Sequence, residues 1–153
     1  MMFDPGNPGA AGKPELRQVR VIKAPPQRVY EAWVRPELCR QWWSADVGMA
    51  CGVCEIDARV GGKFRISMSA KGVEYISVGE YLEVQPPHKL VFTWSWEAPP
   101  GGAQNTVVTL EFKAVPEGTE LTLTHRGFGS IKSRDNHQTG WANCLANLAA
   151  FCE

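Results

Sequence analysis

The stretch from Cys54 to Trp96 decides the fold, and it reads CEIDARVGGKFRISMSAKGVEYISVGEYLEVQPPHKLVFTWSW. Apolar residues alternate with polar ones along it, as they do in strands that have one dry face and one wet face. Gly-Gly, Lys-Gly and Pro-Pro interrupt the alternation at short intervals, which favours antiparallel pairing of consecutive strands. The stretch ends in large aromatic residues. We therefore expect a curved antiparallel sheet with an aromatic inner wall.

The same pattern extends on both sides of this stretch and predicts about seven strands. Their expected ranges are Leu16–Ala24, Val53–Arg59, Lys63–Ala70, Glu74–Val84, Lys89–Trp96, Thr106–Val115 and Glu120–His125. A period of two places alternate residues on the inner face. These are Cys54, Ile56, Phe64, Ile66, Met68, Leu90, Phe92, Trp94, Trp96, Val108, Leu110, Phe112, Leu121, Leu123 and His125. Glu74–Val84 has apolar residues on both faces, so the residues of this strand that face inward are not assigned. Gly79 is a candidate bulge.

Helices are predicted after the first strand and at the end of the chain. Gln27–Val34 follows two prolines, which suit a helix start, and Glu37–Trp43 forms a second short helix. Near the end of the chain, apolar residues recur at helical spacing of four, three and four: Trp141, Leu145, Leu148 and Cys152. We expect Asp135 to cap this helix. The fold class is α+β, with one long helix covering the sheet.

The composition places the chain among ordinary globular domains. Its 153 residues suit one domain. Lys plus Arg (16) balances Asp plus Glu (16), so there is no net positive charge to attract nucleic acid or an anionic membrane. No apolar run approaches the roughly 20 residues of a membrane span. Residues 1–14 are rich in Gly, Pro and Ala and are expected to form a disordered arm before a single domain, 15–153. Five cysteines, an odd number in mostly apolar contexts, favour a reducing cytoplasm.

Several segments, in this order, resemble a known family. They are a first strand that ends in Ala24-Pro25-Pro26, then QRVYEAWVRPEL, QWWS, CEIDARVGGKF, GEYLEVQPPHKLVFTWSW, TVVTLEFKAVPEGTELTLTH and GWANCLANLAAF. The chain is similar, from about Leu16 to Glu153, to proteins related to the activator of the ninety-kilodalton heat-shock protein ATPase. That family lies within the START and birch-pollen-allergen-like (SRPBCC) superfamily.

The resemblance implies a helix-grip fold, in which a curved antiparallel sheet surrounds a long C-terminal helix and two short helices follow the first strand. It also implies a cavity between sheet and helix. The wider superfamily holds ligand carriers, polyketide cyclases, ring-hydroxylase subunits and co-chaperone domains. Fold alone therefore does not fix the activity.

Tryptophans are the most prominent candidates for function. Trp94 and Trp96 share a strand face, Trp141 lies on the covering helix, and the others lie on the small helices. A cavity wall of aromatic side chains suits flat or hydrophobic ligands. Large aromatic side chains also fill protein cores, and both interpretations stay open. The predicted ligand-binding residues are Trp33, Trp43, Phe64, Met68, Phe92, Trp94, Trp96, Leu110, His125, Trp141 and Leu145.

His125 is the candidate for catalysis, because the alternation along its strand places its side chain on the inner face of the sheet. An inward imidazole acts as a general base, holds a polar group of a ligand, or is satisfied structurally by a backbone carbonyl or a neighbour such as Arg126. His88 and His137 are expected to be solvated. Cys51 and Cys54 form a CxxC that enters a strand, whereas redox CxxC motifs start a helix. Neither a second CxxC nor a His pair completes a metal site, so we predict no metal and no cofactor.

Three functional hypotheses follow. The leading one is binding of a small hydrophobic or aromatic molecule between the sheet and the C-terminal helix. The second is a cyclase- or hydrolase-type enzyme that uses His125 with a pocket Tyr or Glu. The third, implied by the resemblance, is a co-chaperone that stimulates a heat-shock ATPase. No nucleic-acid partner is expected, a protein partner stays open, and an exposed edge strand allows a homodimer as well as a monomer.

Overall fold

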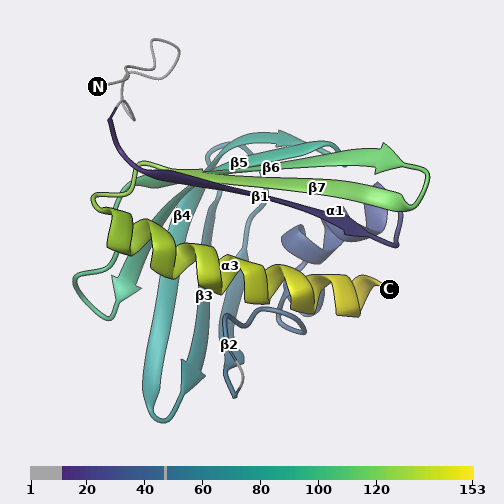
Figure 1. Ribbon diagram of the computed structural model, residues 1–153. Helices are drawn as coiled ribbons and strands as arrows, with labels where there is room; N and C mark the ends of the chain where they lie inside the picture. The colour runs from purple at the N-terminus through teal and green to yellow at the C-terminus, as the bar shows by residue number, and fades with distance from the viewer. Residues whose placement is uncertain (1–11, 47) are drawn as a thin grey trace.

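The computed structural model describes residues 12–46 and 48–153, and it shows a curved antiparallel sheet around a long C-terminal helix (Figure 1). In chain order the elements are β1 (Glu15–Ile22), α1 (Pro26–Val34), α2 (Pro36–Cys39), β2 (Ala50–Ile56), β3 (Lys63–Ala70), β4 (Val73–Gln85), β5 (Lys89–Ala98), β6 (Thr106–Val115), β7 (Gly118–Arg126) and α3 (Ile131–Cys152). The 7-stranded sheet has the order β1-β7-β6-β5-β4-β3-β2. The predicted fold class is therefore confirmed. Residues 1–11 of the predicted arm lie outside the described residues.

The inner face of the sheet follows the predicted alternation. Most of the residues predicted to face inward are buried, and Ile56 and Trp96 are partly buried. The register supports this face, because Phe64 on β3 pairs with Gly79 on β4, and Leu90 on β5 pairs with Leu110 on β6. The alternation of inward and outward residues therefore identified most of the sheet residues that form the core.

The open phase of β4 is explained by a bulge. The register between β4 and β5 shifts between Ile76 and Ser77 and again between Tyr81 and Glu83, and the second shift turns both Tyr81 and Val84 toward the core. The predicted bulge at Gly79 is wrong, since the pairing is in register there. Gly79 is needed for a different reason: an added Cβ would lie 1.9 Å from the carbonyl oxygen of Thr93 and 2.4 Å from the Phe64 ring.

The helix boundaries differ from the predictions at two points. Helix α2 ends at Cys39, so Trp42 and Trp43 follow it outside the helix. Helix α3 begins at Ile131, and the hydroxyl of its N-cap Ser130 accepts a hydrogen bond from the Ser133 amide at 3.1 Å. The predicted N-cap, Asp135, instead lies inside the helix, because Ser130 offers a capping oxygen one turn earlier.

Helix α3 runs across the concave face of the sheet, and its C-terminal end lies beside α1 (Figure 1). The predicted apolar stripe is buried: Trp141, Leu145, Leu148 and Cys152. Arg28 of α1 fixes the end of the helix, since its guanidinium donates to the carbonyl oxygens of Cys152 at 2.7 Å and Phe151 at 3.2 Å. Such donors satisfy carbonyl groups that a helix end leaves unpaired. Within the described residues, no helix is long and apolar enough to span a membrane.

Candidate ligand-binding cleft

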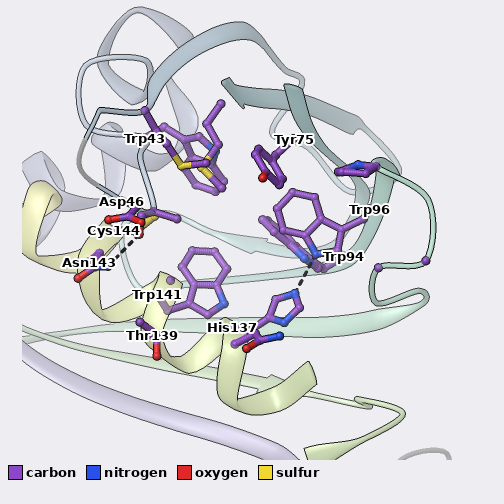
Figure 2. Close-up of a pocket in the computed structure, with 18 of the residues that line it drawn as sticks. Trp43, Asp46, Tyr75, Trp94, Trp96, His137, Thr139, Trp141, Asn143 and Cys144 are labelled. Carbon is purple, nitrogen blue, oxygen red and sulfur yellow. Dashed lines mark hydrogen bonds between the residues drawn. The ribbon is translucent and has the colours of Figure 1, made fainter. Parts of the chain in front are cut away.

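A cleft of about 700 Å³ opens between the N-terminal half of α3 and the strands β3 to β5 (Figure 2). The turn after β5 and the segment before β2 complete its rim. The lining residues are Trp43, Ala45, Asp46, Met49, Met68, Tyr75, Trp94, Trp96, Pro99, Pro100, Gly101, Gly102, Asn136, His137, Thr139, Gly140, Trp141, Asn143 and Cys144. The predicted cavity between sheet and helix is thus present as an open cleft at one end of α3.

Four tryptophans form the wall of the cleft and hold one another in place. The ring centroids of Trp94 and Trp141 lie 5.2 Å apart, and those of Trp94 and Trp96 lie 5.4 Å apart. Trp43 closes the group, at 6.0 Å from Trp94 and 5.8 Å from Trp141. Tilted and edge-to-face contacts at these separations are the arrangements that aromatic rings favour. The wall is therefore built before any ligand arrives.

Trp96 is tied to helix α3 through His137. The indole N–H of Trp96 donates to Nε2 of His137 at 2.8 Å, while Nδ1 of the same ring lies 2.7 Å from the carbonyl oxygen of Ser133. Nε2 accepts and Nδ1 donates, so the imidazole is neutral with its proton on Nδ1. Burial lowers the pKa of His137, and the hydrogen bond to Ser133 opposes part of that shift.

The position of His137 was not predicted from the sequence. Its place near an expected helix start indicated a solvated side chain, but α3 begins four residues before Asp135, at Ile131. His137 therefore lies well inside the helix. Its spacing from Trp141 and Cys144, four and then three residues, places the three side chains on one face of the helix. The signal that could have found His137 was the serine at position 130, which moves the helix start.

His125 lies in the core behind the cleft wall. Its Nδ1 accepts the indole N–H of Trp141 at 3.0 Å, and its Nε2 lies 2.8 Å from the Thr106 hydroxyl, which donates to the Trp94 carbonyl oxygen at 2.8 Å. Every nitrogen of this ring has a partner. Burial first, and the nearby His137 second, lower the pKa of His125 well below its usual value. This neutral imidazole is positioned to hold Trp141, and it does not line the cleft.

The other predicted site residues divide between the cleft and the core. Trp43, Met68, Trp94, Trp96 and Trp141 line the cleft. Phe64, Phe92 and Trp33 line a separate void of about 10 Å³ beneath Trp43 and Trp94. Leu110 and Leu145 are buried in the core and line neither space. Sequence reasoning missed Asp46, Tyr75 and Thr139, which line the cleft from a loop, from β4 and from α3.

The loop that carries Asp46 is fastened to α3 by side chains. The amide of Asn143 donates to the Ala45 carbonyl oxygen at 2.8 Å, and the amide of Asn147 donates to the Ser44 carbonyl oxygen at 3.1 Å. The Cys144 thiol also donates to Ser44, at 3.0 Å. Burial raises the pKa of that thiol to about 12. This part of the rim is therefore held by the same helix that carries Trp141.

The CxxC residues lie at a different site, against α2. Contact with the Cys39 thiol and burial raise the pKa of Cys54 to about 12, and hydrogen bonding to Cys54 raises that of Cys51. All three thiols are free. Thiols with raised pKa values are poor nucleophiles at neutral pH. Among the described residues, no group of three or more His, Cys, Asp or Glu side chains is arranged to hold a metal ion.

Comparisons with known proteins agree with this architecture. A protein from Chromobacterium violaceum has 30% sequence identity and a TM-score of 0.83, covering 91% of this chain and 96% of its own. A protein from Rhizobium leguminosarum (24% identity, TM-score 0.80, covering 92% and 94%) and an AHSA1-like protein from Aeromonas hydrophila (23% identity, TM-score 0.77, covering 90% and 91%) share the fold. No significant match was found among curated proteins. Residues 23–153 match the family model described as Activator of Hsp90 ATPase homolog 1-like protein, and the chain belongs to that family.

Proposed function

We propose that the protein binds a small hydrophobic or aromatic molecule in the cleft between the sheet and α3. The observation that carries this proposal is the wall of Trp43, Trp94, Trp96 and Trp141 beside an open volume of about 700 Å³. Pockets for small ligands usually measure about 300–1,000 Å³ and are mostly apolar with a few polar groups. Here the lining includes the polar side chains of Tyr75 and Asn136.

The packing of the wall supports binding of a flat molecule. Aromatic contacts contribute about 0.5–1.5 kcal/mol each beyond the area that they bury. Because the ring of Trp96 is held by His137 and by Trp94, little side-chain entropy remains to be lost when a ligand stacks on it. A preorganised wall of this kind favours planar ligands over flexible chains.

Binding is favoured over proton-transfer chemistry by the state of the histidines. A general base needs a free lone pair within reach of its substrate. The lone pair of His125 accepts from Trp141, and that of His137, which lines the cleft, accepts from Trp96. Using either ring as a base would require breaking a hydrogen bond that holds the wall. The cyclase- or hydrolase-type alternative therefore ranks second.

The test is a titration followed by intrinsic tryptophan fluorescence, with polycyclic aromatics, flavonoids, sterols and fatty acids as probes. Thr139→Phe adds bulk inside the cleft from an exposed position of α3, and Ala142→Phe is the matched control, exposed on the same helix but outside the cleft lining. We expect saturable quenching in the wild type and in the control. Affinity should fall at least about tenfold, or about 1.4 kcal/mol, in Thr139→Phe.

Two outcomes would contradict the proposal. One is a flat response across the whole panel, which would direct attention to protein partners at the surface. The other is equal affinity in Thr139→Phe and Ala142→Phe, which would place any binding outside this cleft.

A further inference from the structure

His137 joins helix α3 to the cleft wall through a hydrogen bond that depends on its protonation state. The Trp96 indole N–H donates to Nε2 of His137 at 2.8 Å, and Nδ1 of the same ring lies 2.7 Å from the Ser133 carbonyl oxygen (Figure 2). Both nitrogens of a protonated imidazole are donors. A proton on Nε2 therefore sets two donors against each other at the Trp96 contact, whereas the Nδ1–H still holds the ring on Ser133.

Trp96 is the tryptophan of the wall that this change affects most. The other three are 2–4% exposed, and Trp96 is only partly buried. An indole has a single hydrogen-bond donor, so the bond to His137 is the one hydrogen bond that the Trp96 side chain makes. Its remaining restraints are ring packing on Trp94, at 5.4 Å between centroids, and close contact with Gly102. Losing the bond to His137 leaves the ring held by packing alone.

The surroundings of His137 keep its ring neutral near pH 7. Burial lowers the pKa of His137, and the hydrogen bond to Ser133 raises it by a smaller amount. Burial first, and His137 second, hold the pKa of His125 well below its usual value, so His137 is protonated before His125. The titratable groups on the elements around His137 are His125 of β7, Glu97 of β5 in its pair with Arg65, Asp46, Tyr75 and Cys144 of the cleft lining, and Arg134 and Asp135, which pair on α3.

We propose that the cleft releases its ligand in acid, because protonation of His137 frees the Trp96 ring from the wall. This inference concerns the regulation of the same cleft and rests on the proposed binding function. While His137 is neutral, the wall of four tryptophans is complete and affinity is highest. Once His137 is charged, the wall loses the fixed surface of Trp96. Because linkage is reciprocal, a ligand that stacks on Trp96 should also make His137 harder to protonate.

The first measurement follows the Trp96 N–H in the full chain without any ligand. Two-dimensional ¹H–¹⁵N NMR resolves indole N–H signals, and the signal lost in Trp96→Phe identifies this one. Between pH 7.5 and 4.5 we expect it to shift together with the imidazole signals of His137. In His137→Gln the amide oxygen accepts in place of Nε2 and does not titrate, so the signal should stay level. His88→Gln, at an exposed turn residue, is the matched control and should follow the wild type.

The second measurement titrates naphthalenemethanol, an uncharged planar probe, into the same proteins at both pH values, with tryptophan fluorescence as the signal. Circular dichroism confirms that each protein is folded at the lower pH. We expect the wild type and His88→Gln to bind about two- to tenfold more weakly in acid, the equivalent of one aromatic contact. His137→Gln and Trp96→Phe should each bind equally at the two pH values, since neither contains a Trp96 N–H that loses its acceptor.

The outcomes distinguish the inference from the function on which it rests. A Trp96 signal that stays level while His137 titrates, or wild-type affinity that is equal at both pH values, would overturn the release in acid and leave the binding function standing. An equal loss of affinity in the wild type and in His137→Gln would overturn His137 as its source. If neither naphthalenemethanol nor the broader panel binds at pH 7.5, the binding function and its control by pH are both wrong.

Discussion

The indole N–H of Trp96 donates to Nε2 of His137 at 2.8 Å, and this contact joins strand β5 to helix α3 across 41 residues of sequence. A second pair repeats the arrangement deeper in the molecule, where the indole of Trp141 donates to Nδ1 of His125 at 3.0 Å. In both pairs a neutral imidazole orients a tryptophan of the cleft wall. The histidines therefore shape the proposed binding surface.

Removal of the His137 ring should loosen the wall. His137→Ala leaves the Trp96 N–H without its acceptor and should lower the free energy of unfolding by about 0.5–1.5 kcal/mol, the usual worth of a neutral hydrogen bond. Urea unfolding followed by circular dichroism measures the loss. His88→Ala, at an exposed residue in the β4–β5 turn, is the control. Equal stabilities of the two variants would show that the Trp96 contact contributes nothing.

Stability should fall as the pH drops below about 6.5. The native pKa of His125 is lowered by burial, so between the native and unfolded pKa values the unfolded state binds more protons. Above the unfolded value both states are neutral at this site and stability is level. Below it, His125 should contribute a slope of up to about 1.4 kcal/mol per pH unit.

Urea midpoints between pH 7.5 and 5.5 test this slope, in a window above the range where most carboxylates titrate. His125→Gln should reduce the slope, and the part that remains belongs to His137, whose pKa is also lowered by burial. His88→Gln is the control for a histidine substitution at an exposed site. A slope that persists unchanged in His125→Gln would assign the effect to another group.

The Thr106 hydroxyl should contribute to stability, because it joins the buried His125 ring to the Trp94 carbonyl oxygen. Thr106→Val leaves both His125 Nε2 and the Trp94 carbonyl oxygen without their buried partner, and we expect a loss of about 1–3 kcal/mol. Thr106→Ser retains the hydroxyl and should recover much of it. Thr109→Val, at a partly exposed position of the same strand, should be nearly neutral. Thermal or urea unfolding of the three variants decides the point.

Gly79 should not tolerate a side chain. A Cβ at this position would lie 1.9 Å from the Thr93 carbonyl oxygen, so Gly79→Ala must displace the backbone of β5 or the Phe64 ring. We expect a loss of about 3 kcal/mol, at the upper end of the usual overpacking cost. Gly129→Ala is the matched control, because a Cβ there would meet nothing within 4 Å. Comparable unfolding midpoints for the two variants would contradict the expected clash.

Much of the fold could be predicted from local pattern. The alternation in β5 and β6 assigned Trp94 and Leu110 to the inner face, and both are buried. The period of α3 likewise placed Leu148 in the core. These predictions are confirmed because the direction of a side chain follows from the repeat of its own strand or helix.

Less of the candidate site could be predicted, and the errors have identifiable causes. Placing the α3 N-cap at Asp135 hid His137, because a shifted helix start changes which residues appear solvated. Two register shifts between β4 and β5, one beside Tyr75 at Ile76 and Ser77 and one between Tyr81 and Glu83, obscured the face of β4, since an extra residue in one strand interrupts the alternation. Both errors arise where a single residue changes the phase of a repeat.

The sequence by itself determined the sheet, the covering helix and the family to which the chain belongs. Tertiary structure alone decided which inner residues meet open space. Trp141 lines the cleft while Leu145, one turn further along α3, is packed in the core. That difference depends on how closely the helix, the strands and the Asp46 loop approach one another. Such separations are set by contacts between distant segments, and no local repeat encodes them.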